Sequence, residues 1–169
     1  DKDFKQIKKI ESKTNHDVNA VVVFISEKLE KISRKDLIPL VHFGLTSEDI
    51  NNTAYSLMTK GATKNIMVPA IKNVLKELKK LARRTKSLPM LSLTHGQPAT
   101  TTTLGKELAV FISRIERELV LINEINLLAK FSGATGSYAA HKAAFPKADW
   151  SAFAKKFIKR LGLGQSPIT

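Results

Sequence analysis

The chain has 169 residues, of which 43% are hydrophobic and 25% charged, and it contains no cysteine. This length allows one domain with a hydrophobic core, while the missing cysteines exclude disulfides and thiolate metal sites and favour a reducing compartment. No apolar run approaches the roughly 20 residues that a membrane-spanning helix requires, and the charged start of the chain does not resemble a secretory signal. We therefore expect a cytoplasmic protein without a membrane partner.

The composition is strongly basic, with 28 Lys and Arg against 15 Asp and Glu and a formal net charge of +13. A basic surface attracts polyanions, so nucleic acid is a partner to consider. The excess charge is spread along helical segments such as residues 72–84, however, and forms neither a tail nor an arginine-rich arm. A solvated, lysine-rich helix face accounts for this distribution, and we expect no specific nucleic-acid partner.

Apolar residues recur at three- and four-residue steps along most of the chain, which predicts helices. The first apolar stripe covers residues 18–29 and follows a charged helical pattern. A second helix is expected to begin at Thr46 or Ser47, where a capping residue precedes two acids. Gly61 is expected to interrupt that helix, and a further one follows over residues 68–81.

Pro89 ends this pattern, and the polar residues 94–98 lead to the longest predicted helix, over residues 104–128. The glycines at 133 and 136 are expected to end it, and a last amphipathic helix covers about residues 149–161. No segment shows a convincing strand alternation, so the predicted fold class is all-α. The stripe of the longest helix is too extensive for a small monomer to bury, which predicts packing in a bundle with other subunits.

Three of the four histidines lie in polar clusters at predicted helix ends, where backbone N–H groups are free to bind anions. The clusters are residues 14–17, 42–51 and 94–98. Helix capping explains the first two on local grounds, whereas a turn does not require the His95 and Gln97 side chains of the third. The fourth histidine, His141, is expected to be an ordinary helical surface residue or the edge of a site.

The histidines are far apart in sequence and lack the short ligand spacings of zinc sites, so we expect no metal. The sequence also lacks a Walker-type phosphate loop, a Rossmann fingerprint and a serine nucleophile elbow, and it indicates no cofactor. Acid–base chemistry or simple binding are the functions that remain.

In their order and spacing, the three clusters resemble the adenylosuccinate lyase family, and its bacterial branch in particular. The matching stretches are Thr14-Asn15-His16-Asp17-Val18, residues 42–52 and residues 94–100, with further similarity at residues 105–107 and 133–150. The resemblance covers nearly the whole chain, and three motifs in order are far more specific than one.

The resemblance implies a homotetramer of the fumarase, aspartase and argininosuccinate lyase superfamily, built around a bundle of long helices. Residues 1–35 would then end the N-terminal helical domain, and residues 36–169 would form the first part of the central bundle domain. The chain would be an internal piece of the enzyme, without its C-terminal portion.

The implied reaction is the elimination of fumarate from adenylosuccinate, giving AMP, and from the succinylated aminoimidazole carboxamide ribotide of purine biosynthesis. In such an elimination a base removes the proton beside a carboxylate, and an acid protonates the departing nitrogen. Histidine suits the second role because its unperturbed pKa lies near neutrality.

The resemblance assigns the general acid to His95, and to His16 a second catalytic role in contacting and polarising the substrate. The substrate-binding positions that it implies are Asn15, Asp17, Thr46, Ser47, Thr94 and Gln97. The family's base, a serine on a glycine-rich loop that ends in Met-Pro-x-Lys-x-Asn, has no counterpart in this sequence. We therefore expect the chain by itself to lack lyase activity.

Three alternatives remain open on the sequence alone. A sister enzyme such as argininosuccinate lyase would share the fold and the elimination chemistry. The residues of the His16 and His95 motifs favour the adenylosuccinate branch. A basic helical module that binds nucleic acid would leave the three histidine clusters unexplained. In a purely structural helical subunit, the substitution His95→Ala would leave any chemistry of the intact protein unchanged.

Overall fold

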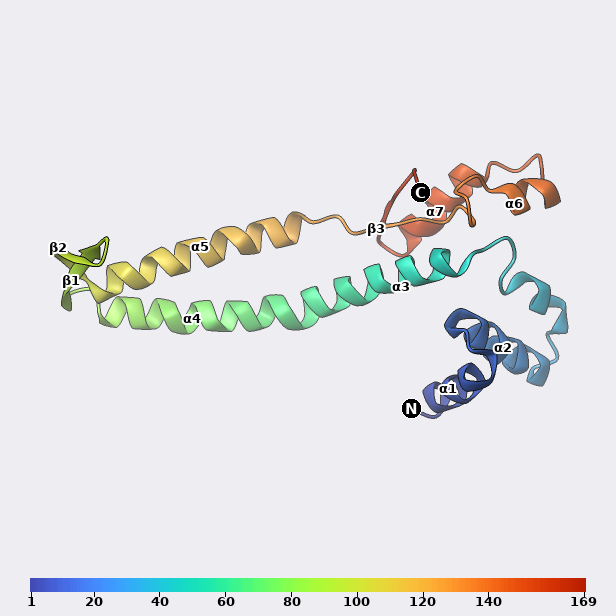
Figure 1. Ribbon diagram of the computed structural model, residues 1–169, viewed down its shortest axis with the longest axis horizontal. Coiled ribbons are helices and arrows are strands. Elements are labelled where there is room, and N and C mark those ends of the chain that lie inside the picture. The colour runs from blue at the N-terminus through green and yellow to red at the C-terminus, as the bar shows by residue number, and fades with distance from the viewer. The chain divides into compact units, whose positions relative to one another are not determined.

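The computed structural model describes residues 1–169, which form two compact units that we describe separately (Figure 1). Unit 1 comprises Asp1–Met58 and Leu127–Thr169, and unit 2 comprises Thr59–Asn126. Helices dominate both units, and the strands form only two small two-stranded sheets. The predicted all-α fold class is therefore confirmed. None of the helices has both the length and the hydrophobicity needed to span a membrane.

Unit 1 begins with two helices that pack against each other, α1 (Lys2–Thr14) and α2 (Asp17–Lys31). Asn15 ends α1 in the left-handed conformation, at φ 51°, and its N–H donates to the Glu11 carbonyl at 2.8 Å. His16 then starts α2 as its N-cap residue, so the turn between the helices is only two residues long. The short 3-10 helix η1 (Lys35–Leu40) leads to α3 (Ser47–Ala62).

The second half of unit 1 contains β3 (Leu128–Ala129), α6 (Ala139–Ala144), α7 (Trp150–Arg160) and β4 (Gly164–Gln165). The strands β3 and β4 pair in parallel. A small apolar core lies beside them, formed by the buried residues Ala129, Ile158 and Leu163. On the other edge of β3, Ser56 Oγ of α3 donates to the Leu128 carbonyl at 2.6 Å.

Unit 2 contains the π-helical turn η2 (Thr63–Met67), α4 (Val68–Arg84), β1 (Pro89–Thr94), β2 (Gln97–Thr103) and α5 (Leu104–Glu124). The helices α4 and α5 lie side by side, joined at one end by the β1–β2 hairpin (Figure 1). Their contact buries residues at helical spacing, namely Val68, Leu75, Ile112 and Leu119.

The α4–α5 pair closes tightly at its hairpin end because the second residue of α5, Gly105, is a buried glycine. A Cβ added to Gly105 would lie 2.4 Å from the Ala82 carbonyl oxygen and 2.6 Å from Lys86 Cα. Thr103 caps α5 by accepting the N–H of Lys106 with its hydroxyl.

Several predicted boundaries need correction. Gly61 does not interrupt its helix, because α3 continues to Ala62 and the irregularity is the π turn that follows. The longest helix ends at Glu124 rather than 128, since Ile125 turns to an extended conformation and leads into β3. The last predicted helix is confirmed as α7, with Asp149 as its N-cap.

The β1–β2 hairpin is the main departure, because no strand was expected. Its register pairs Pro89 with Thr103 and Thr94 with Gln97, with a bulge between Leu91 and Leu93. The sequence holds a signal for it: four consecutive β-branched threonines follow a His-Gly dipeptide that can form a tight turn. The predicted domain boundary at residue 35, which refers to the whole enzyme, stays a prediction.

Candidate active site

His16 lies at the N-terminus of α2, where its extended backbone places the imidazole over the first turn. Its Nδ1 accepts the N–H of Asn19 at 3.3 Å. A neutral imidazole that accepts at Nδ1 carries its proton on Nε2. That nitrogen lies 3.3 Å from Ser47 Oγ at the start of α3. His16 is therefore oriented with a donor toward the α3 N-terminus.

Asp17 forms a second link between the starts of α2 and α3. Its Oδ1 accepts the N–H of Val18 at 2.7 Å, and its Oδ2 accepts from Asn51 Nδ2 at 3.4 Å. The Val18 N–H, helped by the Asn51 amide and His16, holds the pKa of Asp17 below its usual value. Asn51 lies one helical turn after Ser47, so both links use the same face of α3. His16 Nδ1 lies 3.3 Å from Asp17 Oδ1, so the two side chains at the start of α2 are adjacent.

The start of α3 is capped from inside the helix. Asp49, in the first turn, accepts the N–H of Thr46 at 3.0 Å, which is one half of a capping box. The first N–H groups of any helix have no intrahelical carbonyl, and the helix dipole favours an anion beside them. Ser47 adds a hydroxyl at this position, so the α3 N-terminus is suited to bind a carboxylate.

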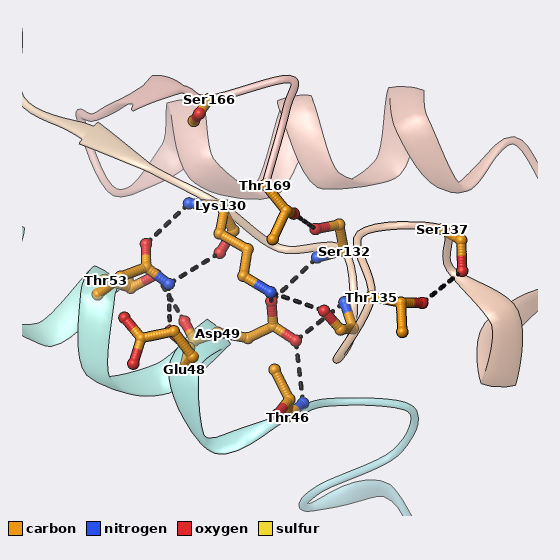
Figure 2. A network of polar contacts seen from close by, with 12 residues as sticks. Thr46, Glu48, Asp49, Thr53, Lys130, Ser132, Thr135, Ser137, Ser166 and Thr169 are labelled. Atoms are coloured by element: carbon orange, nitrogen blue, oxygen red, sulfur yellow. Dashed lines mark hydrogen bonds and ion pairs between the residues drawn. The ribbon is translucent and has the colours of Figure 1, made fainter.

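Asp49 also binds the segment that follows β3, as Figure 2 shows. Its Oδ1 accepts the N–H of Ser132 and its Oδ2 that of Gly133, both at 3.0 Å, while Lys130 Nζ lies 3.0 Å from Oδ1. Burial alone would raise the pKa of Asp49. The N–H groups of Thr46 and Ser132, together with Lys130, outweigh burial and hold this pKa below its usual value.

The predicted acid, His95, lies in unit 2 at the tip of the β1–β2 hairpin. His95 and Gly96 both have left-handed backbones, at φ 53° and 73°, as a two-residue type I′ turn requires. Histidine is one of the few non-glycine residues enriched in this conformation. Thr94 and Gln97 pair across the turn, so these predicted positions are neighbours on one hairpin and the imidazole is exposed at its end.

The predicted positions therefore fall into two groups. Unit 1 brings His16 and Ser47 into contact and joins Asp17 to the same face of α3, with Asn15 and Thr46 adjacent in sequence. Unit 2 groups Thr94, His95 and Gln97. Sequence reasoning missed the roles of Asn51, Asp49 and Lys130. Of these three, only Asp49 has a local signal in the sequence, as the first-turn acid of a capping box that starts at Thr46.

The expectation that His141 is an ordinary helical surface residue is wrong, because the side chain is 1% exposed. The rings of Phe43, Phe131 and Trp150 surround it, with centroids 5.7, 5.4 and 4.7 Å away. Neither ring nitrogen has a hydrogen-bond partner, and burial lowers the pKa of His141. Gly44, at φ 66°, makes room for the ring, because a Cβ there would lie 2.7 Å from Nε2.

Across the chain, no three His, Cys, Asp or Glu side chains gather in an arrangement that could hold a metal ion.

Comparison with known proteins identifies the relatives of the chain. A family model described as a lyase matches residues 1–167. The adenylosuccinate lyase of Buchnera aphidicola subsp. Acyrthosiphon pisum is 44% identical, and the match covers 100% of this chain and 37% of that protein. The adenylosuccinate lyase of Vibrio cholerae is 44% identical over 166 residues, which cover 97% of this chain and 36% of that protein.

The fold of the chain is also similar to that of a solved structure. The crystal structure of fumarate lyase from Mesorhizobium sp. BNC1 matches with a TM-score of 0.79 at 26% identity, covering 98% of this chain and 37% of that one. The chain spans only 36–37% of the length of the two curated relatives. Because the lyase family model matches nearly every residue, the chain belongs to the lyase family.

Proposed function

We propose that the full-length protein carrying this chain is an adenylosuccinate lyase. It would release fumarate by β-elimination from adenylosuccinate, leaving AMP, and from the succinylated aminoimidazole carboxamide ribotide. The observation that carries this proposal is the 44% identity to an adenylosuccinate lyase, which extends over the whole chain. The grouping of His16 and Ser47 at two helix N-termini supports it, because such a site suits an acidic substrate.

The α3 N-terminus is proposed to bind a carboxylate of the succinyl group. Removing a proton beside that carboxylate creates a carbanion whose charge spreads onto the carboxylate oxygens. Ser47 Oγ and the first N–H groups of α3 would donate hydrogen bonds to those oxygens. His16 Nε2, which is 3.3 Å from Ser47 Oγ, would donate from the side of α2, and Thr46, Asn15 and Asp17 would complete this part of the site.

His95 is proposed as the general acid. The nitrogen that leaves in the elimination would depart poorly as an anion, so an acid must protonate it as the bond breaks. The type I′ turn presents the imidazole at the end of a hairpin, and Thr94 and Gln97 on either side are proposed to contact the substrate.

The base is proposed to come from a segment outside this sequence, because the 169 residues contain no Met-Pro-x-Lys-x-Asn run. We therefore expect no fumarate release from this chain alone.

We also propose that the enzyme is a cytoplasmic homotetramer. Several large apolar side chains of α4 and α5 are exposed, among them Val74, Phe111, Val120 and Leu121 at 51–57%. A second set of helices would cover them, at about 25 cal/mol for each Å² of apolar surface removed from water. The proposed substrates carry phosphate and carboxylate charges that do not cross a membrane, so the enzyme would work in the compartment that makes them.

The experiment follows fumarate release by the full-length protein from adenylosuccinate, with argininosuccinate as the comparison substrate. We expect turnover of adenylosuccinate only. The variant His95→Asn should lower kcat by about 10²–10⁴-fold, because asparagine keeps the preference for the left-handed turn but cannot supply the proton. Circular dichroism checks that the variant is folded.

Each alternative has its own outcome. Turnover of argininosuccinate would point to the sister enzyme. Turnover of neither substrate, together with nucleic-acid binding that weakens steeply with salt, would replace the lyase proposal by a basic binding module. Full activity of His95→Asn would remove His95 from the acid role.

A further inference from the structure

We infer that Asp49, together with Lys130, is a positioning residue for the proposed carboxylate site at the start of α3. The inference rests on the proposed function. Asp49 does not point at the substrate in this assignment; it fixes the backbone that does. The buried carboxylate joins the first turn of α3 to the segment after β3, and Lys130 cancels its charge.

The first support is the number and direction of the hydrogen bonds that Asp49 accepts. Three backbone N–H groups donate to it at 3.0 Å, those of Thr46, Ser132 and Gly133. They come from two segments more than 80 residues apart in sequence, |i−j| being 83 for Ser132 and 84 for Gly133. The residue is 2% exposed, so the carboxylate is shielded from bulk solvent. Figure 2 shows both segments converging on the carboxylate.

Lys130 holds the segment after β3 through both its side chain and its backbone. Its Nζ lies 3.0 Å from Asp49 Oδ1 and donates to the Gly133 carbonyl at 2.6 Å. Its backbone N–H donates to Asn52 Oδ1 at 2.8 Å, and its carbonyl accepts from Asn52 Nδ2 at 3.3 Å. Asn52 follows Asp49 by one helical turn. The side chains of α3 therefore hold the segment at two successive points.

The position of the pair relative to Ser47 gives the inference its functional content. Asp49 follows Ser47 by two residues in the same helical turn, so any shift of the carboxylate moves the backbone that carries the Ser47 hydroxyl. That hydroxyl is 3.3 Å from His16 Nε2, and its placement decides whether both can reach one ligand. A displacement of about 1 Å at such a site is enough to impair positioning.

The charges explain why a lysine accompanies the aspartate. A lone carboxylate this close to the α3 N-terminus would repel the carboxylate of the substrate. Lys130 neutralises Asp49, so this buried carboxylate holds the N–H groups in place without adding a net negative charge of its own beside the anion site. Apolar residues of similar size can equal a buried ion pair in stability, but they cannot hold three N–H donors at defined positions.

The test uses the full-length protein and the variants Asp49→Asn, Lys130→Met and the double variant. Each single change leaves one buried charge without its partner, so both should lower Tm and raise KM. The double variant restores charge balance and should regain much of the Tm. Its KM for adenylosuccinate should stay raised by about tenfold, because an asparagine cannot accept all three N–H groups.

The exposed ion pair between Lys79 and Glu116, at 2.5 Å on the α4–α5 pair, supplies the matched control. The double change Lys79→Met and Glu116→Gln should leave KM unchanged. Recovery of the wild-type KM together with the Tm in the Asp49 and Lys130 double variant would reduce the pair to a structural role and overturn the inference. Unchanged KM in both single variants would overturn it too.

Amide hydrogen exchange separates this inference from the lyase proposal, because it needs no substrate. In Asp49→Asn the amides of Thr46, Ser132 and Gly133 should exchange faster, while amides in the centre of α5 keep their protection. Unchanged exchange at the three amides refutes the anchoring itself, whatever the activity. A wild-type protein that releases no fumarate refutes the lyase proposal, whereas an active enzyme with normal KM in the variants refutes only the positioning role.

Discussion

Unit 1 contains buried polar side chains that affect its stability, and His141 is the clearest case. Its ring nitrogens have no partner, and aromatic rings surround it. Burial disfavours the charged imidazolium, which lowers the pKa of His141 in the folded chain. In the unfolded chain a histidine titrates near pH 6.5, so below that pH the unfolded state binds an additional proton. This binding stabilises the unfolded state relative to the folded one.

We therefore expect the free energy of unfolding to fall as the pH is lowered from 7.5 to 5.5, and this dependence to become shallower in His141→Phe. Phenylalanine fills the same aromatic surroundings but does not titrate. Urea unfolding at the two pH values measures the difference. Lys142→Ala changes the exposed neighbour on α6 and should keep the wild-type slope. An equal slope in His141→Phe would show that other groups cause the pH dependence.

At the scale of elements, the close approach of α5 to α4 depends on one missing side chain. Gly105→Ala would place a Cβ 2.4 Å from the Ala82 carbonyl oxygen, so the helices must separate at the hairpin end. We expect a loss of about 1–3 kcal/mol in the free energy of unfolding, as for other overpacked sites.

The control for Gly105 is another helical glycine. A Cβ at Gly61 meets nothing within 4 Å, so Gly61→Ala should gain about 0.5–1 kcal/mol from helix propensity alone. Denaturant unfolding of both variants gives the comparison. Similar effects of the two substitutions would mean that the tight contact between α4 and α5 does not limit the packing of unit 2.

The elements also show what the sequence can predict. Helices α2, α4 and α7 follow from apolar residues at helical spacing, because each buries one face. The β1–β2 hairpin has no buried face, and most of its residues are exposed, so no alternation of apolar and polar residues marks it. The π turn η2 likewise has no buried residue to reveal it.

For the candidate site, local motifs indicated the residues at helix starts and turns, such as His16, Ser47 and His95. They could not indicate the Asp49 network, because its partners are more than 80 residues away along the chain. Whether a first-turn acid is exposed or buried depends on what packs over it. That is a tertiary property, and no local pattern in the sequence encodes it.

At the scale of the whole molecule, the net charge of +13 opposes the compact state through self-repulsion. Part of this charge lies on α4, where a groove is lined by Lys72, Lys76, Lys79, Lys80 and Arg83 and by a single acid, Glu116. Salt screens charges that are more than about 10 Å apart at 0.1 M ionic strength. We therefore expect Tm to rise as NaCl is increased from about 10 to 150 mM.

The variant Lys76→Glu tests the source of this salt effect. It places an acid four residues from both Lys72 and Lys80, and each such pair contributes roughly 0.2–0.5 kcal/mol in a helix. Its Tm at low salt should exceed that of the wild type, and its rise with salt should be smaller. A Tm that does not change with salt in either protein would show that the charge is too dispersed to affect folding.

The hydrogen bonds that α3 side chains make to the segment 128–130 have one more consequence. One edge of the short strand β3 pairs with β4, and the other would expose free peptide groups. Ser56 and Asn52 occupy that edge by bonding to the carbonyl of Leu128 and to both backbone groups of Lys130. An unprotected strand edge is a template on which a second chain can add and begin aggregation. By bonding to this edge, the side chains of α3 leave fewer free peptide groups on β3 for a second chain to pair with.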